Sequence, residues 1–151
     1  MRRVPLPRLA RIALSIFVCA VALAVTGPVE ARAMTTPEAR LLHRVNHVRA
    51  AHGLRRVQVG STIQSAAHSW AVYLRQHSAF YHGRLSLGTS ENIGWLTCRR
   101  DWAHDLVRMW LNSPTHRVHL LDPGARRIGV GVSRGRWSGY SCVRIGVTRF
   151  R

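Results

Sequence analysis

The segment Ile128-Gly-Val-Gly-Val-Ser133 decides the fold class, because branched apolar residues alternate in it with glycine or serine. A period of two residues is typical of a half-buried β-strand. The glycine-bounded stretch 135–139 follows, and then a second alternating run at 140–150. Two such runs joined by a short glycine-containing connection predict a β-hairpin, so this part of the chain is expected to form a sheet.

Upstream of the hairpin, the apolar residues recur with the period of a helix. Thr36 as N-cap, with the proline and glutamate that follow it, opens a helix over about 37–52, and Gly53 closes it as a left-handed cap. The residues expected on its buried face are Leu41, Val45 and Val48, with Leu42 on the flank. His43, Arg44 and His47 are expected to point away from that face.

Two further helices and a helical turn are predicted before the hairpin. The second helix begins at Ser61 and runs to about His77, with an apolar face of Ile63, Ala66, Ala67, Trp70, Tyr73 and Leu74. The third follows Asp101 as N-cap, with a buried stripe of Trp102, Leu106, Met109 and Trp110. Pro114 breaks this helix and begins a short turn through His116. Helices first and paired strands last predict an α+β fold.

The composition is strongly basic. The 151 residues include 23 Lys and Arg against 6 Asp and Glu, a formal charge of +17, and every one of these cations is an arginine. An anionic partner is therefore expected, although a GC-rich genome also explains an arginine bias. The hydrophobic content of 46% and the five tryptophans exclude a disordered polycation and fit one packed domain.

The beginning of the chain has the pattern of a secretory signal peptide. Four arginines within residues 2–11 precede an uncharged run from Ile12 to Thr26, and Ala31-Arg-Ala33 offers small residues for cleavage. We therefore predict a signal peptide at 1–33 and a single domain at 34–151. The alternative, a membrane anchor, is disfavoured because the run is shorter than the roughly 20 residues that span a bilayer. After cleavage 18 arginines and 5 acidic residues remain, so the mature charge is +13.

Export also bears on the cysteines. Cys19 lies in the signal segment and is expected to leave with it, whereas Cys98 and Cys142 remain as an even pair. In an oxidising compartment a disulfide between these two residues is the expectation. Two free thiols, or a metal-binding pair, are the alternatives.

Six segments of the mature chain carry a pattern that occurs together in one family. They are 42–54, 66–71, Phe80-Tyr-His82, Ser90-Glu-Asn-Ile93, Trp110-Leu-Asn-Ser-Pro-Thr-His-Arg117 and 128–132. In this order they resemble the CAP superfamily of cysteine-rich secretory, antigen five and pathogenesis-related one proteins, in its shorter bacterial SCP-like form. The resemblance implies a three-layer α-β-α sandwich with a central antiparallel sheet.

The family's cleft is built around two histidines and acidic residues. The resemblance places His82 and His116 on the two histidines and Glu91 on the first glutamate. The second glutamate is missing, because Asn112 stands at its position, as in bacterial members. The candidate cleft is therefore His82, Glu91 and His116, together with Asn92 and Asn112.

Two imidazoles and one carboxylate are the ligand set of many zinc sites that keep an open coordination position. We therefore predict that His82, Glu91 and His116 bind Zn²⁺. The alternatives are a buried polar network in which Glu91 fixes the loops, and a general base formed by a histidine that a carboxylate orients.

Other histidines compete for these roles. His77 competes with His82, but His82 better fits the aromatic-x-His position of the family. His43 and His47, four residues apart on a helix, form another possible metal pair, with exposed histidines as the simpler interpretation.

The leading hypothesis is a secreted or cell-wall-associated CAP-domain protein whose cleft binds a lipid or cell-envelope ligand. The alternatives are a metal-dependent hydrolase using the same cleft, and a cationic, antimicrobial-like protein acting on the envelope through surface charge. Anionic cell-wall polymers, lipids or glycans are the expected partners, whereas specific nucleic-acid binding is not expected, because no reading motif is present. The arginine pairs 55–56, 99–100 and 126–127 form no single stripe in the sequence.

Overall fold

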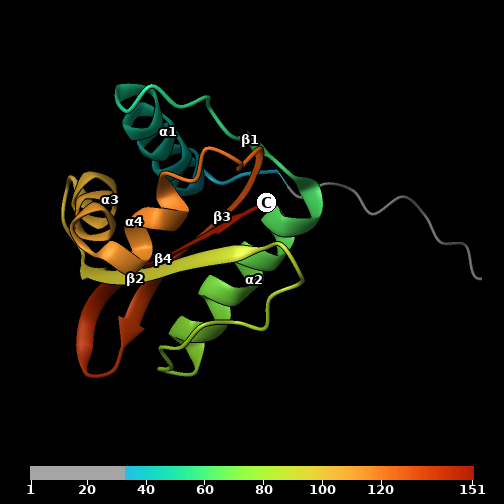
Figure 1. The fold of residues 1–151 in the computed structure, drawn as a ribbon. Coiled ribbons are helices and arrows are strands. Elements are labelled where there is room, and N and C mark those ends of the chain that lie inside the picture. The colour runs from blue at the N-terminus through green and yellow to red at the C-terminus, as the bar shows by residue number, and fades with distance from the viewer. Residues whose placement is uncertain (1–32) are drawn as a thin grey trace, which may run out of the picture.

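The computed structural model describes residues 33–151, in which a four-stranded sheet lies between helices (Figure 1). The elements in chain order are α1 (Thr36–Ala51), β1 (Gln58–Val59), α2 (Ser61–Gln76), β2 (Ser90–Thr97), α3 (Trp102–Asn112), α4 (Pro114–Leu120), β3 (Arg127–Trp137) and β4 (Tyr140–Phe150). The strand order is β1-β3-β4-β2. Strands β3, β4 and β2 pair antiparallel, and the two-residue β1 runs parallel to β3 at the other edge. The α+β prediction is confirmed.

Residues 1–32, which contain Cys19 and all but the last residue of the predicted signal peptide, lie outside the described part of the chain. Within 33–151, no helix combines the length and the apolar character that crossing a membrane requires.

The sheet separates two hydrophobic cores. Helix α2 packs on one face, where its side chains meet Ile93, Val143, Ile145 and Val147. Helices α1, α3 and α4 cover the opposite face, where Trp102, Leu106 and Trp110 pack against Ile128 and Val130. Figure 1 shows α2 on the other side of the strands from α3 and α4. This arrangement confirms the three-layer sandwich, with a sheet that is mixed rather than wholly antiparallel because β1 runs parallel to β3.

Residues 128–133 of strand β3 are buried on both faces, so the prediction of a half-buried strand was wrong for this segment. All residues of 128–133 are buried. A Cβ at Gly129 or Gly131 would collide with the carbonyl oxygen of Ile63 or Ala67 in α2. The two glycines therefore let helix α2 lie directly on the strand. The alternation arises because the glycines face α2 and the branched residues face the core under α1, α3 and α4, and not because one face is exposed to solvent.

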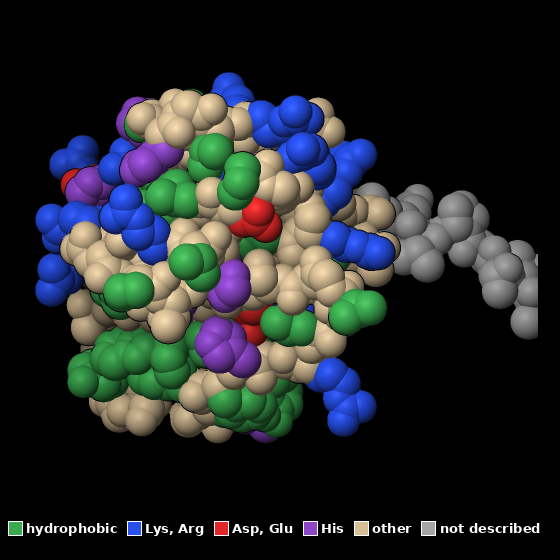
Figure 2. All heavy atoms as spheres, in the orientation of Figure 1, with side chains coloured by type: hydrophobic (Ala, Val, Ile, Leu, Met, Phe, Trp, Pro, Cys, Tyr) green, Lys and Arg blue, Asp and Glu red, His purple; other side chains and the backbone are tan. Residues whose placement is uncertain are grey.

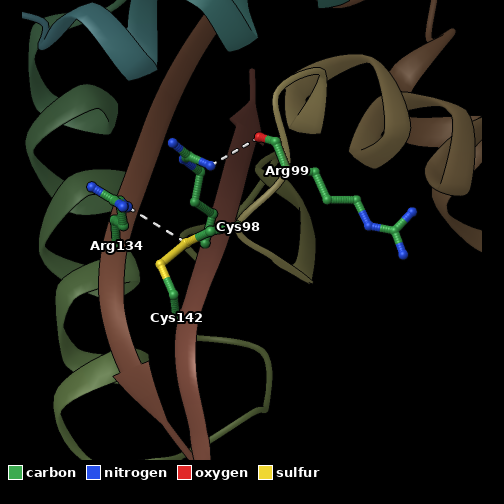
Figure 3. Close-up of a disulfide and its surroundings, with 5 residues drawn as sticks. Cys98, Arg99, Arg134 and Cys142 are labelled. Atoms are coloured by element: carbon green, nitrogen blue, oxygen red, sulfur yellow. Dashed lines mark hydrogen bonds between the residues drawn. A yellow bond between two sulfur atoms is a disulfide. The ribbon is translucent and has the colours of Figure 1, made fainter.

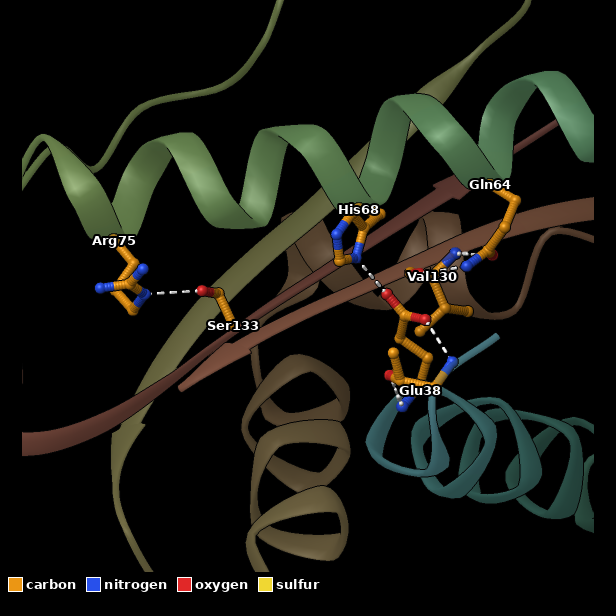
Figure 4. A network of polar contacts seen from close by, with 7 residues as sticks. Glu38, Gln64, His68, Arg75, Val130 and Ser133 are labelled. Carbon is orange, nitrogen blue, oxygen red and sulfur yellow. Dashed lines mark hydrogen bonds and ion pairs between the residues drawn. The ribbon is translucent and has the colours of Figure 1, made fainter. Parts of the chain in front are cut away.

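Polar side chains of α2 add specific ties, shown in Figure 4. The Gln64 amide donates to the carbonyl of Val130 and accepts from its N–H, both at 2.8 Å. The Gln64 side chain thereby pairs backbone groups at the edge of β3 that the short β1 does not reach. His68 Nδ1 lies 2.7 Å from a carboxylate oxygen of the fully buried Glu38, which joins α2 to α1.

The helix ends follow capping rules with small shifts. The N-cap of α1 is Thr35 rather than Thr36, because Thr35 and Glu38 form a reciprocal capping box. Gly53 has the predicted left-handed conformation, with φ of 68°. Helix α4 extends four residues beyond the predicted turn.

Two side chains predicted to be buried are exposed. Tyr73 of α2 is 37% exposed and stacks on Trp70, with ring centroids 5.0 Å apart. Met109 of α3 is 40% exposed, and Val107 is buried in its place. Each of the two residues lies at the border between the buried and the exposed face of its helix.

The predicted disulfide between Cys98 and Cys142 is present (Figure 3). It joins the residue after β2 to the beginning of β4, and the Cα atoms are 5.5 Å apart. Arg134 Nε lies 3.5 Å from Cys98 Sγ. The bridge fastens the end of the edge strand β2 to the middle of the sheet.

Candidate functional site

The candidate site begins with an ion pair across two strands. The antiparallel register places Glu91 of β2 directly opposite Arg149 of β4. Arg149 Nε donates to Glu91 Oε2 at 2.8 Å, and both residues are more than nine-tenths buried. A buried carboxylate needs such a partner, because removal from water disfavours an uncompensated charge.

His82 comes to the same carboxylate from the connection between α2 and β2. Its Nδ1 lies 3.0 Å from Glu91 Oε1, and the N–H of Gly83 donates to that oxygen at the same distance. The His82 side chain is 55% exposed, whereas the Glu91 side chain is fully buried. Because Nδ1 is engaged, Nε2 is the ring nitrogen of His82 that remains for a ligand.

His116 approaches β2 from α4, on the other side of the sheet. Its Nδ1 lies 2.8 Å from Ser113 Oγ, and its backbone carbonyl accepts from Asn92 Nδ2 at 3.0 Å. Burial lowers the pKa of His116, and the charges of His82 and His119 lower it further. The charge of His82 thus acts on His116 from the opposite side of the edge strand.

An apolar pocket of about 370 Å³ opens beside His116. Its lining residues come from both sides of β2 and are Phe80, Ile93, Gly94, Trp95, Met109, Trp110, Ser113 and His116. The Trp110 indole N–H donates to the Ile93 carbonyl at 3.0 Å, which fixes this wall. Figure 2 shows hydrophobic side chains gathered beside two histidines near the middle of this face.

Two other candidates lie apart from this arrangement. Asn112 is exposed at the end of α3 and lines a separate hollow with Arg99 and Asp105. His77 Nδ1 contacts the carbonyl of Tyr73, 3.0 Å away, and its ring stacks on that residue. The structure therefore brings His82, Glu91, Asn92 and His116 together.

The residues present do not fit a three-ligand metal site. Within residues 33–151, no group of three or more His, Cys, Asp or Glu side chains is placed to hold a metal ion. Both oxygens of Glu91 already accept hydrogen bonds, one from Arg149 and the other in contacts with His82 and Gly83. The carboxylate thus orients His82, as outer partners of histidine ligands do. His82 Nε2 and His116 Nε2 are the nitrogens left for a metal.

Comparison with known proteins identifies the family. The model of the cysteine-rich secretory protein family, CAP, matches residues 42–145. The chain belongs to the CAP family. The predicted membership is therefore confirmed, and the match includes His82, Glu91 and His116.

The CAP relatives are distant in sequence. The chain is 26% identical over 106 residues to the Bacillus subtilis protein YkwD, a match that covers 62% of this chain and 41% of YkwD. An outer surface protein of Borrelia burgdorferi has a TM-score of 0.56 at 18% identity, covering 79% of this chain and 96% of that one. BmVAL-1 has a TM-score of 0.59 at 13% identity, with 80% and 79% covered. These structures share the CAP fold with this chain.

Sequence reasoning missed three residues that build the site. Arg149 was not selected, because only the strand register places it opposite Glu91. Ser113 orients His116 and was read only as part of a motif. A Cβ on Gly83 would collide with the Arg149 guanidinium, so the glycine after His82 is a sequence signal of this close packing.

Proposed function

We propose that this CAP-domain protein is exported and that the pocket beside β2 binds an amphipathic ligand, a lipid or an apolar component of the cell envelope. The observation that carries the proposal is the composition of the pocket wall. Trp95, Trp110 and Met109 form an apolar surface, and His116 is the ionisable side chain in the lining. Ligand pockets combine an apolar lining with a few placed polar groups in this way.

Two buried polar side chains lie near His116 but do not line the pocket. Asn92 and Thr148 are directly opposite each other on β2 and β4, so their side chains share a face of the sheet. Asn92 Oδ1 and Thr148 Oγ1 are buried and have no hydrogen-bond partner within residues 33–151. Neither residue lines the pocket and both are fully buried, so the polar end of a ligand meets His116 and Ser113 of the lining instead.

Export is part of the same proposal. The matched family is described as secretory, and the chain carries a disulfide, which persists in oxidising compartments. The similar Borrelia burgdorferi protein is by its name an outer surface protein. The charged start and the apolar run within residues 1–33 supply the targeting pattern.

A fluorescent fatty acid titrated into the purified protein tests the pocket. Phe80 lines the pocket and is 45% exposed, so Phe80→Ala should weaken binding roughly tenfold without loss of the fold. Tyr81→Ala is the matched control, because Tyr81 is an exposed aromatic outside the lining. Equal losses in the two variants, or no binding by the wild type, would contradict the proposal.

Zinc binding by His82, Glu91 and His116 was the prediction from the sequence. Because Glu91 is engaged by Arg149, His82 and Gly83, we propose instead that His82 and His116 are the ligands and that Glu91 orients His82. Such a site leaves coordination positions open and fits weak, exchangeable binding. A metal-dependent hydrolase in this cleft, and an envelope activity due to charge alone, remain the alternatives. The fatty-acid titration separates pocket binding from the charge-driven alternative, because Phe80→Ala leaves the charge unchanged.

A further inference from the structure

Two arginine pairs that are far apart in the sequence meet at the β1 edge of the sheet. Arg55 and Arg56 precede β1, and Arg126 and Arg127 stand at the beginning of β3. The parallel pairing of β1 with β3 places Gln58 opposite Arg127. The four arginines and Gln58 line one hollow of about 260 Å³. Arginine side chains gather on the face of Figure 2 around the position of β1 in Figure 1.

The guanidinium groups of this arginine hollow form no ion pair within residues 33–151. The ion pairs within residues 33–151 involve Glu38, Glu91 and Asp105, and none includes an arginine of the hollow. Asp122 is the acid on the neighbouring segment, and its Oδ1 accepts from the N–H of Gly124. Like charges gathered in one concave site raise the local concentration of anions.

Hydrogen bonds hold part of the hollow in place. Arg126 Nη1 donates to the carbonyls of Pro123 and Gly124 at 2.7 and 3.0 Å. Arg127 Nη1 donates to Gln58 Oε1 at 3.0 Å. Each guanidinium has five N–H donors, so most of them remain for a ligand. Groups that are already fixed lose less entropy when they bind.

A fifth arginine, Arg49, lies behind the hollow and joins its two sides. Its fully buried side chain donates from Nε to the carbonyl of Arg55 at 3.1 Å, and from Nη1 to the carbonyl of Asp122 at 3.0 Å. The two segments that carry the arginine pairs are therefore fastened to one buried cation. Arg49 Nη2 is also buried and has no hydrogen-bond partner within the described residues.

We propose that Arg55, Arg56, Arg126 and Arg127 form a binding site for a phosphate group. The planar guanidinium binds phosphate oxygens through two parallel N–H donors, and several arginines around one tetrahedral anion satisfy all its oxygens. The hollow is polar and has the volume for one phosphate with a small attached group. The site lies at the opposite edge of the sheet from the apolar pocket and does not depend on the proposed function.

Titration of the protein with inorganic phosphate, against the same concentration of chloride, tests this site. R55Q/R56Q should weaken phosphate binding roughly tenfold or more, because charge-assisted hydrogen bonds are lost. The matched control is R99Q/R100Q, which removes the same charge from another exposed arginine pair, outside the hollow. The control should keep the wild-type affinity within about twofold. Equal weakening in both double variants, or no phosphate binding by the wild type, would overturn the proposal.

A polyphosphate chain, compared with inorganic phosphate at equal phosphate concentration, distinguishes a polymer from a free anion as the source of the group. Tighter binding of the chain that R55Q/R56Q abolishes supports the site and assigns it to a polymer. Equal binding of both forms, again lost in R55Q/R56Q, supports the site and assigns it to single phosphate groups. Chain binding that R99Q/R100Q weakens as much as R55Q/R56Q overturns the site. Phe80→Ala should leave phosphate binding unchanged, so failure of the pocket proposal is separable from failure of this one.

Discussion

The two edges of the sheet treat charge in opposite ways. At the β2 edge, the buried Glu91 is neutralised by Arg149 and contacts His82. At the β1 edge, four arginines share one hollow, and no carboxylate within residues 33–151 pairs with them. Burial explains the difference, because a charge removed from water needs a partner, while an exposed charge is solvated. The β2 edge is thus built around an internal charge pair, and the β1 edge presents its charge to solvent.

The largest loss of stability is expected from a substitution of Arg149. Arg149→Met leaves Glu91 buried without its cation, so the free energy of unfolding should fall by about 3 kcal/mol in urea denaturation. The double variant Glu91→Gln with Arg149→Met should recover part of this loss, because no charge is then stranded. The matched change at the other edge, Arg55→Met, should alter stability by about 0.5 kcal/mol or less. Similar losses for Arg149→Met and Arg55→Met would show that the two edges do not differ.

A smaller effect is expected from zinc at the β2 edge. With zinc at about 100 times its Kd, the wild type should gain about 2.7 kcal/mol of stability, and His116→Ala should abolish this gain. Affinity should fall in acid, because a histidine must be neutral to bind the metal, and the lowered pKa of His116 places the loss of this ligand below its reference value of about 6.5. Calorimetric titration of both proteins provides the measurement. Equal heats would place any metal elsewhere, for example at His43 and His47.

The smallest effect concerns the titration of His116. Its pKa is lowered in the folded protein, first by burial and then by the charge of His82, so the unfolded chain binds the proton more tightly. The corresponding stability is present above about pH 6.5 and is lost as the pH falls from there towards the lowered pKa. His116→Asn should therefore flatten this part of the stability profile in urea denaturation at pH 7.5 and 5.5. An unchanged profile would show that His116 is not perturbed by its surroundings.

The helices and the last two strands could be predicted, because their patterns are local. Leu41, Val45 and Val48 mark one face of α1 at helical spacing, and all three are buried. Strand β2 was not predicted from periodicity, since it begins with the polar Ser90-Glu-Asn92, whose burial depends on distant partners. The alternation in β3 correctly predicted a strand. It did not predict that both faces of residues 128–133 are buried, because that burial depends on the close packing of α2.

The candidate sites show the same limit. The family motif selected His82, Glu91 and His116, and these residues lie around one edge strand. The partner of Glu91 is 58 residues away in the sequence, so strand register was needed to find Arg149. The arginine hollow could not be found as a continuous run of arginines in the sequence. The parallel pairing of β1 with β3 brings together two arginine pairs that are about 70 positions apart.

The central claim is that the β2 edge binds an amphipathic ligand at a site distinct from the arginine hollow. Chemical-shift mapping of the ¹⁵N-labelled protein tests it directly, with decanoic acid and inorganic phosphate added separately. Decanoic acid should shift the indole N–H signals of Trp95 and Trp110 and leave the backbone signals of Arg55 and Arg127 unchanged, whereas phosphate should do the reverse. Shifts by decanoic acid at the arginine hollow, or no shift at either tryptophan, would contradict the account.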